Sequence, residues 1–196
     1  MATSKAIILI TGANSGVGFG LASQLMARGS YHVLLGSRTV EKGDKAVKEL
    51  QARYRSQAEA IELVHIDVTD DEMISKAAAT VEQRHSRVDM IVNNAAVTLM
   101  DLPFRQQMRE SFDTNATGPI AVVRAFTPLL RKSTMTSPSP RIVNITSGAG
   151  LIGRCLDPTS PMYGMQGWQY RASKAALNMV TAIQWVEFGP DIKVFA

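Results

Sequence analysis

The segment GWQYRASKAALN, residues 167–178, holds a tyrosine and a lysine four positions apart, Tyr170 and Lys174. Four residues make about one turn of an α-helix, so on a helix the two side chains share a face. A free tyrosine ionises only near pH ~10, and a cation at ~4 Å in surroundings of dielectric ~20 favours the phenolate by up to ~4 kcal/mol. The spacing therefore indicates an acid–base pair that works near neutral pH. The alternative is an ordinary amphipathic pair on a solvent-facing helix.

A glycine-rich turn, TGANSGVG, follows the apolar run at residues 6–10 and precedes a helical pattern. Glycines permit a tight turn and a close backbone approach to a ligand, and a helix N-terminus offers free N–H groups to a phosphate. This placement favours a dinucleotide-binding loop, with the spacing G-x-x-x-G-x-G, over a purely structural turn. The loop residues that we expect to cradle the cofactor phosphates are Gly12, Ser15, Gly16, Val17 and Gly18.

The second apolar run ends in GSRT, which puts Arg38 where a cofactor with a free ribose 2′-hydroxyl usually meets an acidic residue. Residues 29–40 contain no carboxylate, and a guanidinium can hold a 2′-phosphate through paired, charge-assisted hydrogen bonds. The pattern favours NADP over NAD. The alternative is a solvated arginine at the start of the next helix.

The third apolar run leads into DVTD, where Asp67 and Val68 would lie over the same sheet edge and flank an adenine. Asp67 could also cap the helix that follows, and the two roles do not exclude each other.

Polar side chains also mark two other strand ends and one helix. NNAA at residues 93–96 includes Asn94, and its amides can tie neighbouring strand ends together beside small residues that leave room for a ligand. Ser147 is either a cap or a hydrogen-bond donor to substrate. Asn115 lies within a helical pattern, where asparagine is a poor choice unless its amide is used.

Apolar runs of strand length alternate with helical patterns, which is typical of βαβ units and predicts an α/β fold with a doubly wound parallel sheet, the Rossmann fold. Strands are expected at 6–10, 31–37, 60–66, 88–93 and 141–146, and a sixth begins at DIKVFA, 191–196. Helices are expected at 17–28, 41–56, 70–86, 107–132 and from about 162 or 169 to 188, with a cap in TDDE at 69–72 and a surface loop at 133–140. Ligands of such sheets bind beyond the carboxyl ends of the strands.

The composition sets further bounds. With 196 residues, 45% of them hydrophobic, the chain suits a single globular domain over 1–196. The net charge of +4 is spread out, so no nucleic-acid-binding arm is predicted. The single cysteine, Cys155, excludes an intramolecular disulfide, and the apolar run at 6–10 is too short for a signal peptide or membrane span. A cytoplasmic protein without membrane partners is the expectation.

The ordered set of motifs resembles the short-chain dehydrogenase/reductase family, in particular its single-domain carbonyl reductases. The resemblance covers essentially the whole chain. The matching positions are Thr11-Gly12-x3-Gly16-x-Gly18, Asn93-Asn94-Ala95, Asn115, Ser147 and Tyr170-x3-Lys174.

The resemblance implies a role for each matching residue. Tyr170 would be the general acid that protonates a substrate carbonyl, Ser147 would hold its oxygen, and Asn115 would anchor a water in a proton relay. Lys174 would bind the nicotinamide ribose and tune the tyrosine, so Tyr170 and Lys174 also count as cofactor-binding. The glycine loop would hold the phosphates, and Arg38, Asp67, Val68 and Asn94 would lie along the adenosine half. Arg124 is sometimes near the cofactor in similar chains, although two and a half helical turns point it away from Asn115. No metal is implied.

Two departures from the family stand out. The 23 positions from Ser147 to Tyr170 are more than usual, which predicts a loop inserted over the active site as a substrate wall or lid. Tyr163 in this loop is not expected to be the catalytic tyrosine, because the residue four positions after it is Gly167 and not a lysine. Family members also continue beyond the sixth strand, so the resemblance implies that the last strands are missing and the domain is incomplete at its carboxyl end, as a fragment or by natural truncation.

The favoured function is an NADP-dependent oxidoreductase that acts on the carbonyl or secondary alcohol of a small molecule, with a homo-oligomer as an open option. The alternative is a truncated, inactive relative that binds cofactor or partners without turnover. An epimerase or dehydratase of the related extended branch is a weaker third hypothesis, because 196 residues leave no room for that branch's larger substrate region.

Overall fold

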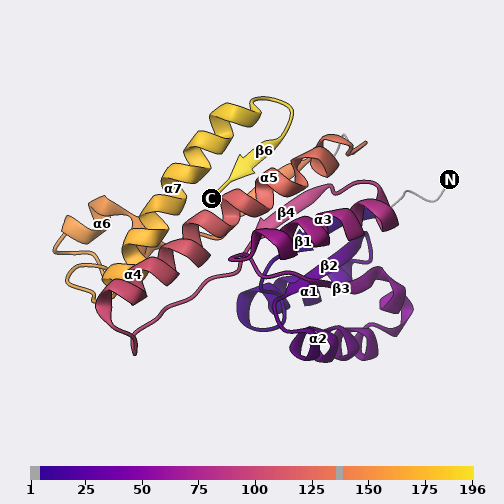
Figure 1. Ribbon diagram of the computed structural model, residues 1–196, viewed down its shortest axis with the longest axis horizontal. Helices are drawn as coiled ribbons and strands as arrows, with labels where there is room; N and C mark the ends of the chain where they lie inside the picture. Colours follow the sequence, from indigo (N-terminus) through magenta and orange to yellow (C-terminus); the bar gives the residue numbers. More distant parts are fainter. Residues whose placement is uncertain (1–4, 136–138) are drawn as a thin grey trace.

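A parallel β-sheet forms the centre of the protein in the computed structural model, which describes residues 5–135 and 139–196. In this described part the sheet has six strands in the order β3-β2-β1-β4-β5-β6 (Figure 1). Their bounds are β1 Ala6–Ile10, β2 Tyr31–Ser37, β3 Ile61–His65, β4 Met90–Asn93, β5 Arg141–Asn144 and β6 Lys193–Phe195. The order reverses between β1 and β4, which confirms the predicted doubly wound fold.

Seven α-helices and three short helical turns connect the described strands. The helices are α1 Gly16–Arg28, α2 Val40–Arg53, α3 Asp71–His85, α4 Phe104–Phe112, α5 Gly118–Arg131, α6 Ile152–Leu156 and α7 Trp168–Phe188. The turns are η1 Arg55–Ala60, η2 Asp113–Thr117 and η3 Gly148–Gly150. None of the helices in the described ranges is long and apolar enough to cross a membrane.

Helices cover both faces of the sheet, which explains why β1 is apolar at every position. Ile8 and Ile10 belong to a core with α1 and α2, whereas Ile7 and Leu9 belong to a core with α3, α5 and the end of α7. Figure 1 shows α2 and α3 on opposite sides of the sheet. Alternate residues of a strand point to opposite faces, so a strand buried on both sides must be apolar throughout.

The helical path predicted at 107–132 is present, but it is not one regular α-helix. The chain forms α4, one π-helical turn and α5, with Asn115 inside the π turn. Pro119 has no N–H to donate to the carbonyl four residues back, and the N–H of Gly118 bonds to the carbonyl of Asp113, five residues back. The π turn thus begins α5 without a break in the helical path.

Other boundaries differ by a few residues. α2 ends at Arg53 because the chain tightens into the 3-10 turn η1, and β5 ends at Asn144 because the chain then turns toward η3. Asp70 caps α3 by accepting a hydrogen bond from Met73 N at 2.9 Å, as TDDE predicted. The predicted loop at 133–140 includes residues 136–138, which lie outside the described residues.

Buried amides fasten α7 to the sheet. Asn93 Nδ2 donates to Asn144 Oδ1 at 2.8 Å, so the amide at the end of β4 ties two neighbouring strand ends together as predicted. Asn144 Nδ2 in turn donates to Thr181 Oγ1 and to Gln184 Oε1, both at 2.9 Å. All four side chains are buried, so these bonds hold α7 at a defined position along β5.

Candidate active site

A cavity of about 480 Å³ opens at the carboxyl ends of the strands, where β1, β2, β3 and β4 lead into their loops. The predicted cofactor residues that line it are Gly12, Ser15, Gly16, Val17, Arg38, Asp67, Val68 and Asn94. The cavity is also lined by Asn14, Thr39, Lys42, Ile66, Ala95, Ala96, Val97 and Thr114. Residues from four separate strand ends therefore share one cavity, as expected of a parallel sheet.

The glycine-rich loop has the shape that its sequence requires. Gly12 has φ +63°, and a Cβ there would lie 2.8 Å from Ala95 Cα. A Cβ on Gly18 would lie 2.5 Å from Asn94 Nδ2, the same amide that donates to Thr11 O at 2.9 Å. Gly18 does not line the cavity, and it lets α1 pack closely on this loop. The exposed turn at the start of α1 leaves free N–H groups facing the cavity, which suits a pyrophosphate.

The far end of the cavity carries positive charge. Arg38 and Lys42 both line it with exposed side chains, Arg38 just before α2 and Lys42 in its first turn. Ser37 Oγ donates to Thr39 O at 2.8 Å and accepts from Thr39 N at 3.3 Å, which holds the turn that presents Arg38. Lys42 was not predicted as a site residue from the sequence. Its position four residues after Arg38, in the first turn of α2, is the signal that could have found it.

Asp67 holds a turn and also lines the cavity. Its Oδ1 accepts hydrogen bonds from Thr69 N at 3.0 Å and Thr69 Oγ1 at 2.8 Å. The carboxylate therefore holds the DVTD turn, while the cap of α3 itself is Asp70. Asp67 and Val68 line the cavity, whereas the alternative that Asp67 caps the following helix is wrong, because Asp70 is that cap.

Lys174 is the buried cation of the site. Only 2% of the residue is exposed, and its Nζ donates a hydrogen bond to Ile145 O, just beyond β5, at 2.7 Å. The Nζ lies 5.8 Å from the centroid of the Tyr170 ring, so the two side chains do share one face of α7. Burial lowers the pKa of Lys174 from its ordinary value of 10.5 to about 8, because a charged ammonium is poorly solvated there.

Asn115 has a full set of buried hydrogen bonds, which accounts for an asparagine inside a helical pattern. Its Oδ1 accepts from Val97 N at 2.8 Å, and its Nδ2 donates to Val97 O at 2.9 Å and to Ser173 Oγ at 3.0 Å. Ser173 Oγ donates in turn to Tyr170 O at 2.8 Å. The π turn is thereby linked through Ser173, a residue that we did not predict, to the tyrosine's own helical turn.

Ser147 lies at the start of η3, and η3 packs against α7. Ser147 Oγ accepts a hydrogen bond from Ala149 N at 3.1 Å, so the serine does act as a cap. A Cβ on Gly150 would lie 2.7 Å from the carbonyl carbon of Lys174, which shows how closely η3 approaches α7. Asn178 Nδ2 donates to Gly150 O at 3.3 Å and helps to hold this contact.

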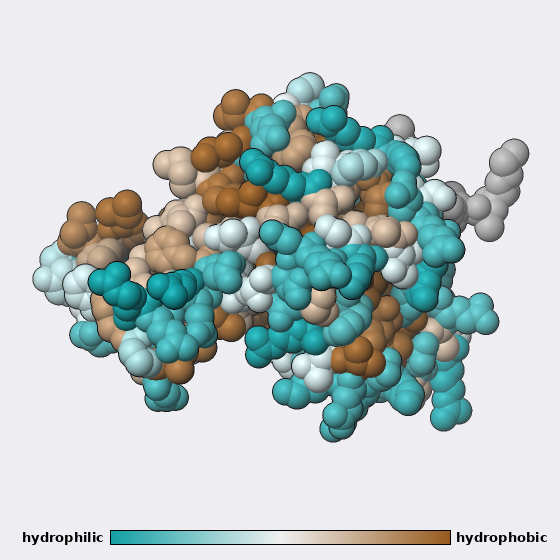
Figure 2. Space-filling view, viewed as in Figure 1, coloured by the Kyte–Doolittle hydropathy of each residue, from teal (hydrophilic) through white to brown (hydrophobic). Residues whose placement is uncertain are grey.

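The segment between η3 and α7 is mostly turns plus the short helix α6, in line with the predicted inserted loop. It exposes large apolar side chains: Ile152 is 71% and Leu156 72% exposed. Figure 2 shows apolar residues gathered over α6 and α7. Trp168, at the start of α7, contacts Phe104 of α4 edge to face, with 6.5 Å between ring centroids.

Arg124 lies apart from the other predicted site residues. Its side chain lines a different cavity, between α5 and α7, with Val180 and Glu187. The structure therefore gives the predicted cofactor contact of Arg124 no support.

Known proteins resemble the chain over nearly its full length. Residues 6–196 match the family described as short chain dehydrogenase. Short-chain dehydrogenase anuI of Penicillium roqueforti is 40% identical over 191 residues, which cover 94% of this chain and 73% of that protein. NADPH carbonyl reductase 1 of Sus scrofa is 30% identical over 164 residues, which cover 82% of this chain and 53% of that protein. The crystal structure of NADPH-bound carbonyl reductase from chicken fatty liver superposes with a TM-score of 0.79 and 30% identity, covering 96% of this chain and 76% of that one.

Proposed function

Because the chain belongs to the short-chain dehydrogenase family and is an oxidoreductase by that membership, we propose that it reduces a carbonyl group of a small molecule with NADPH, or runs the reverse oxidation of a secondary alcohol. The observation that carries this proposal is the pair on α7: a buried Lys174 ammonium lies 5.8 Å from the centroid of the Tyr170 ring. Lys174 Nζ donates to Ile145 O just beyond β5, at the same carboxyl edge of the sheet as the cavity.

The cavity fits a dinucleotide by its shape and its donors. Gly12 keeps the loop against Ala95, where a side chain would collide, and the start of α1 presents N–H groups to a diphosphate. We assign the phosphates to Gly12, Ser15, Gly16 and Val17. When bound there, the dinucleotide supplies or accepts the hydride.

Two cations favour NADP over NAD in this proposal. A 2′-phosphate carries extra negative charge, and Arg38 and Lys42 line the end of the cavity that follows β2. A guanidinium pairs with phosphate oxygens through two parallel hydrogen bonds, and an ammonium adds a point charge. The NADPH named in the two carbonyl reductases described above is consistent with this preference.

In the proposed reaction Tyr170 donates its phenolic proton to the substrate oxygen, and the O–H bond of the tyrosine breaks as that of the alcohol forms. Lys174 stabilises the resulting phenolate by its positive charge. Ser147 donates its hydroxyl hydrogen bond to the substrate oxygen. Asn115 keeps the π turn and the loop at Val97 in place, and we propose that it anchors a water that returns the proton.

We further propose that residues 1–196 form one NAD(P)-binding domain, in which the segment at 150–168 forms the wall of the substrate site. Its exposed apolar residues, such as Ile152 and Leu156, would favour an apolar substrate.

The test compares two tyrosines. Tyr170→Phe should lower carbonyl-dependent NADPH oxidation by roughly 10²–10⁴-fold, the usual contribution of a general acid, while NADPH binding persists. Tyr31→Phe is the matched control, because Tyr31 begins β2 at the sheet edge opposite to the cavity and should keep full activity. Full turnover by Tyr170→Phe would refute the assignment.

The cofactor preference is tested separately. Arg38→Ala should weaken NADPH binding by about 10- to 100-fold and leave NADH binding nearly unchanged, because only the contact with the 2′-phosphate is lost. Equal affinity of the unmodified protein for NADPH and NADH would contradict the preference. NADPH binding without turnover on a broad carbonyl panel would favour a non-catalytic cofactor-binding relative.

A further inference from the structure

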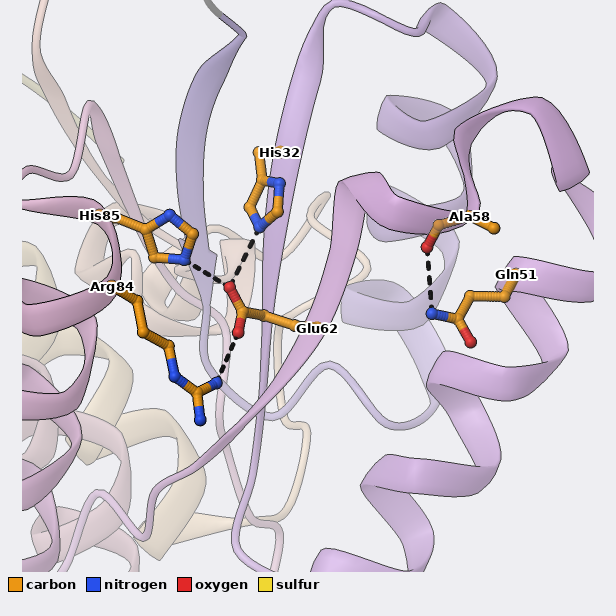
Figure 3. Close-up of polar contacts among 6 residues, drawn as sticks. All are labelled: His32, Gln51, Ala58, Glu62, Arg84 and His85. Carbon is orange, nitrogen blue, oxygen red and sulfur yellow. Dashed lines mark hydrogen bonds and ion pairs between the residues drawn. The ribbon is translucent and has the colours of Figure 1, made fainter.

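Two histidines and a glutamate meet at the amino edge of the sheet. His32 comes from the start of β2, Glu62 from the start of β3, and His85 is the last residue of α3 (Figure 3). Glu62 Oε1 contacts His32 Nε2 at 3.1 Å and also contacts His85 Nε2. One potential ligand atom from each of the three residues can be chosen so that the three atoms lie within 4.8 Å of one another. Three side chains therefore point at one small volume.

The fold, not sequence proximity, brings these residues together. Leu34 is opposite Glu62 in the β2–β3 register, so His32, two residues before Leu34, lies on the same face of the sheet as Glu62. α3 packs on that face and ends at His85. Glu62 is separated from His32 by 30 positions and from His85 by 23, so no sequence motif announces the cluster.

The glutamate is already oriented to present one oxygen. Arg84 Nη1 holds Glu62 Oε2 at 2.7 Å, which leaves Oε1 to the two imidazoles. The cluster is also shielded, since the side chains of His32, Glu62 and His85 are 20%, 25% and 17% exposed. A second contact that fixes the orientation of a ligating carboxylate is a usual feature of metal sites.

We propose that His32, Glu62 and His85 bind one zinc ion. Two imidazole nitrogens and one carboxylate oxygen are ligands that Zn²⁺ prefers, whereas Mg²⁺ and Ca²⁺ prefer oxygen alone. Ligand atoms about 2.1 Å from a tetrahedral ion stand roughly 3.4 Å apart, close to the 3.1 Å between His32 Nε2 and Glu62 Oε1. Small side-chain rotations would complete the geometry, and water would fill the fourth position.

Binding changes the protonation of the two rings. Each Nε2 that donates to Glu62 in the metal-free protein must present its lone pair to the ion, so its proton moves to Nδ1 or is released to solvent. No electron is transferred, and Arg84 keeps its contact with Glu62 Oε2.

The ion would fasten the end of α3 to the amino ends of β2 and β3. This point is about 20 Å along β2 from Arg38, because a strand rises about 3.3 Å per residue over the six steps from His32. The proposed role is therefore structural, and it does not depend on the oxidoreductase reaction.

The test uses the untagged 196-residue chain after treatment with a chelator. Titration with CoCl₂ should saturate at one Co²⁺ per chain with visible absorption bands of a four-coordinate ion, and ZnCl₂ should abolish the bands and raise the melting temperature. His32→Gln and His85→Gln should each weaken binding at least ~10-fold. His65→Gln is the matched control, because His65 is the chain's remaining histidine, is exposed, and should keep full affinity.

Several outcomes would overturn the site. These are an absence of saturable binding, unchanged affinity in both His32→Gln and His85→Gln, or lost affinity in His65→Gln. A second measurement needs no variant: in the NMR spectrum, ZnCl₂ should shift the ring protons of His32 and His85 and leave those of His65 in place. A shift of the His65 signals alone would equally contradict the proposal.

Discussion

Replacing the buried Lys174 by methionine should change how the free energy of unfolding depends on pH. Burial lowers the pKa of Lys174 from 10.5 in the unfolded chain to about 8 in the folded protein. The folded protein therefore carries an unfavourable charged group below about pH 8. Between about pH 8 and 10.5 the unfolded chain binds more protons than the folded one, so this contribution to stability rises with pH.

The magnitude follows from the same two pKa values. A difference of about 2.5 pH units at about 1.4 kcal/mol each amounts to roughly 3 kcal/mol of destabilisation near pH 7. Methionine keeps the apolar length of the side chain and removes the charge. It also removes the hydrogen bond to Ile145 O, which offsets about 1.5–3 kcal/mol. We expect the net gain near pH 7 to be about 0–2 kcal/mol.

The more precise test is how the gain in stability of Lys174→Met over the unmodified protein changes with pH. Because methionine does not titrate, the pH dependence of this advantage comes only from the two pKa values of Lys174, and the advantage of Lys174→Met over the unmodified protein should shrink by about 2 kcal/mol between about pH 7 and about pH 9.5. Urea unfolding followed by circular dichroism at both pH values measures it.

Lys48→Met provides the control, because it removes one positive charge from an exposed position of α2. An advantage of Lys174→Met that stays constant with pH, or an equal pH effect in Lys48→Met, would refute the reasoning. Lys174→Met should in addition lose carbonyl-dependent NADPH oxidation.

Three further predictions concern the loop, the core and acid stability. Gly12→Ala, whose Cβ would lie 2.8 Å from Ala95 Cα at φ +63°, should cost about 1–3 kcal/mol of stability and weaken NADPH binding, measured by urea unfolding and ligand titration. Asn144→Ala should lower the free energy of unfolding by about 2–4 kcal/mol, because Thr181 Oγ1 and Gln184 Oε1 lose their donor and Asn93 Nδ2 loses its acceptor inside the protein; a loss below ~0.5 kcal/mol would contradict this. The hydrogen bond from His32 holds the pKa of Glu62 down at about 2, against 4.5 ordinarily, so in chelator-treated protein this carboxylate contributes stability above pH 4.5 that is lost as the pH falls toward 2. Glu62→Gln should flatten that part of the acid-unfolding curve, and an unchanged curve would count against the assignment.

Local sequence patterns were sufficient to predict the strands of the sheet and the order in which the elements of the candidate site follow one another. The run AIILI could only be a strand buried on both faces, and Tyr170 and Lys174 had to share a face once they lay on one helix. Periodicity predicted the helical path at 107–132 but not the π turn inside it, where Pro119 and the buried amide of Asn115 replace regular helical bonding. The bonds from Asn115 to Val97 and Ser173 join distant parts of the chain, which periodicity cannot reveal.

The sequence by itself determined the α/β fold, the strand ends at which the chemistry lies, and the spacing of the tyrosine and the lysine. These properties depend on residues within one turn or one strand of each other. Only the tertiary structure decided how deeply Lys174 is buried, that Lys42 joins Arg38 at the cavity, and that His32, Glu62 and His85 meet at the opposite edge. Burial and convergence come from packing between segments far apart in the chain, and that packing sets the solvation of each charge.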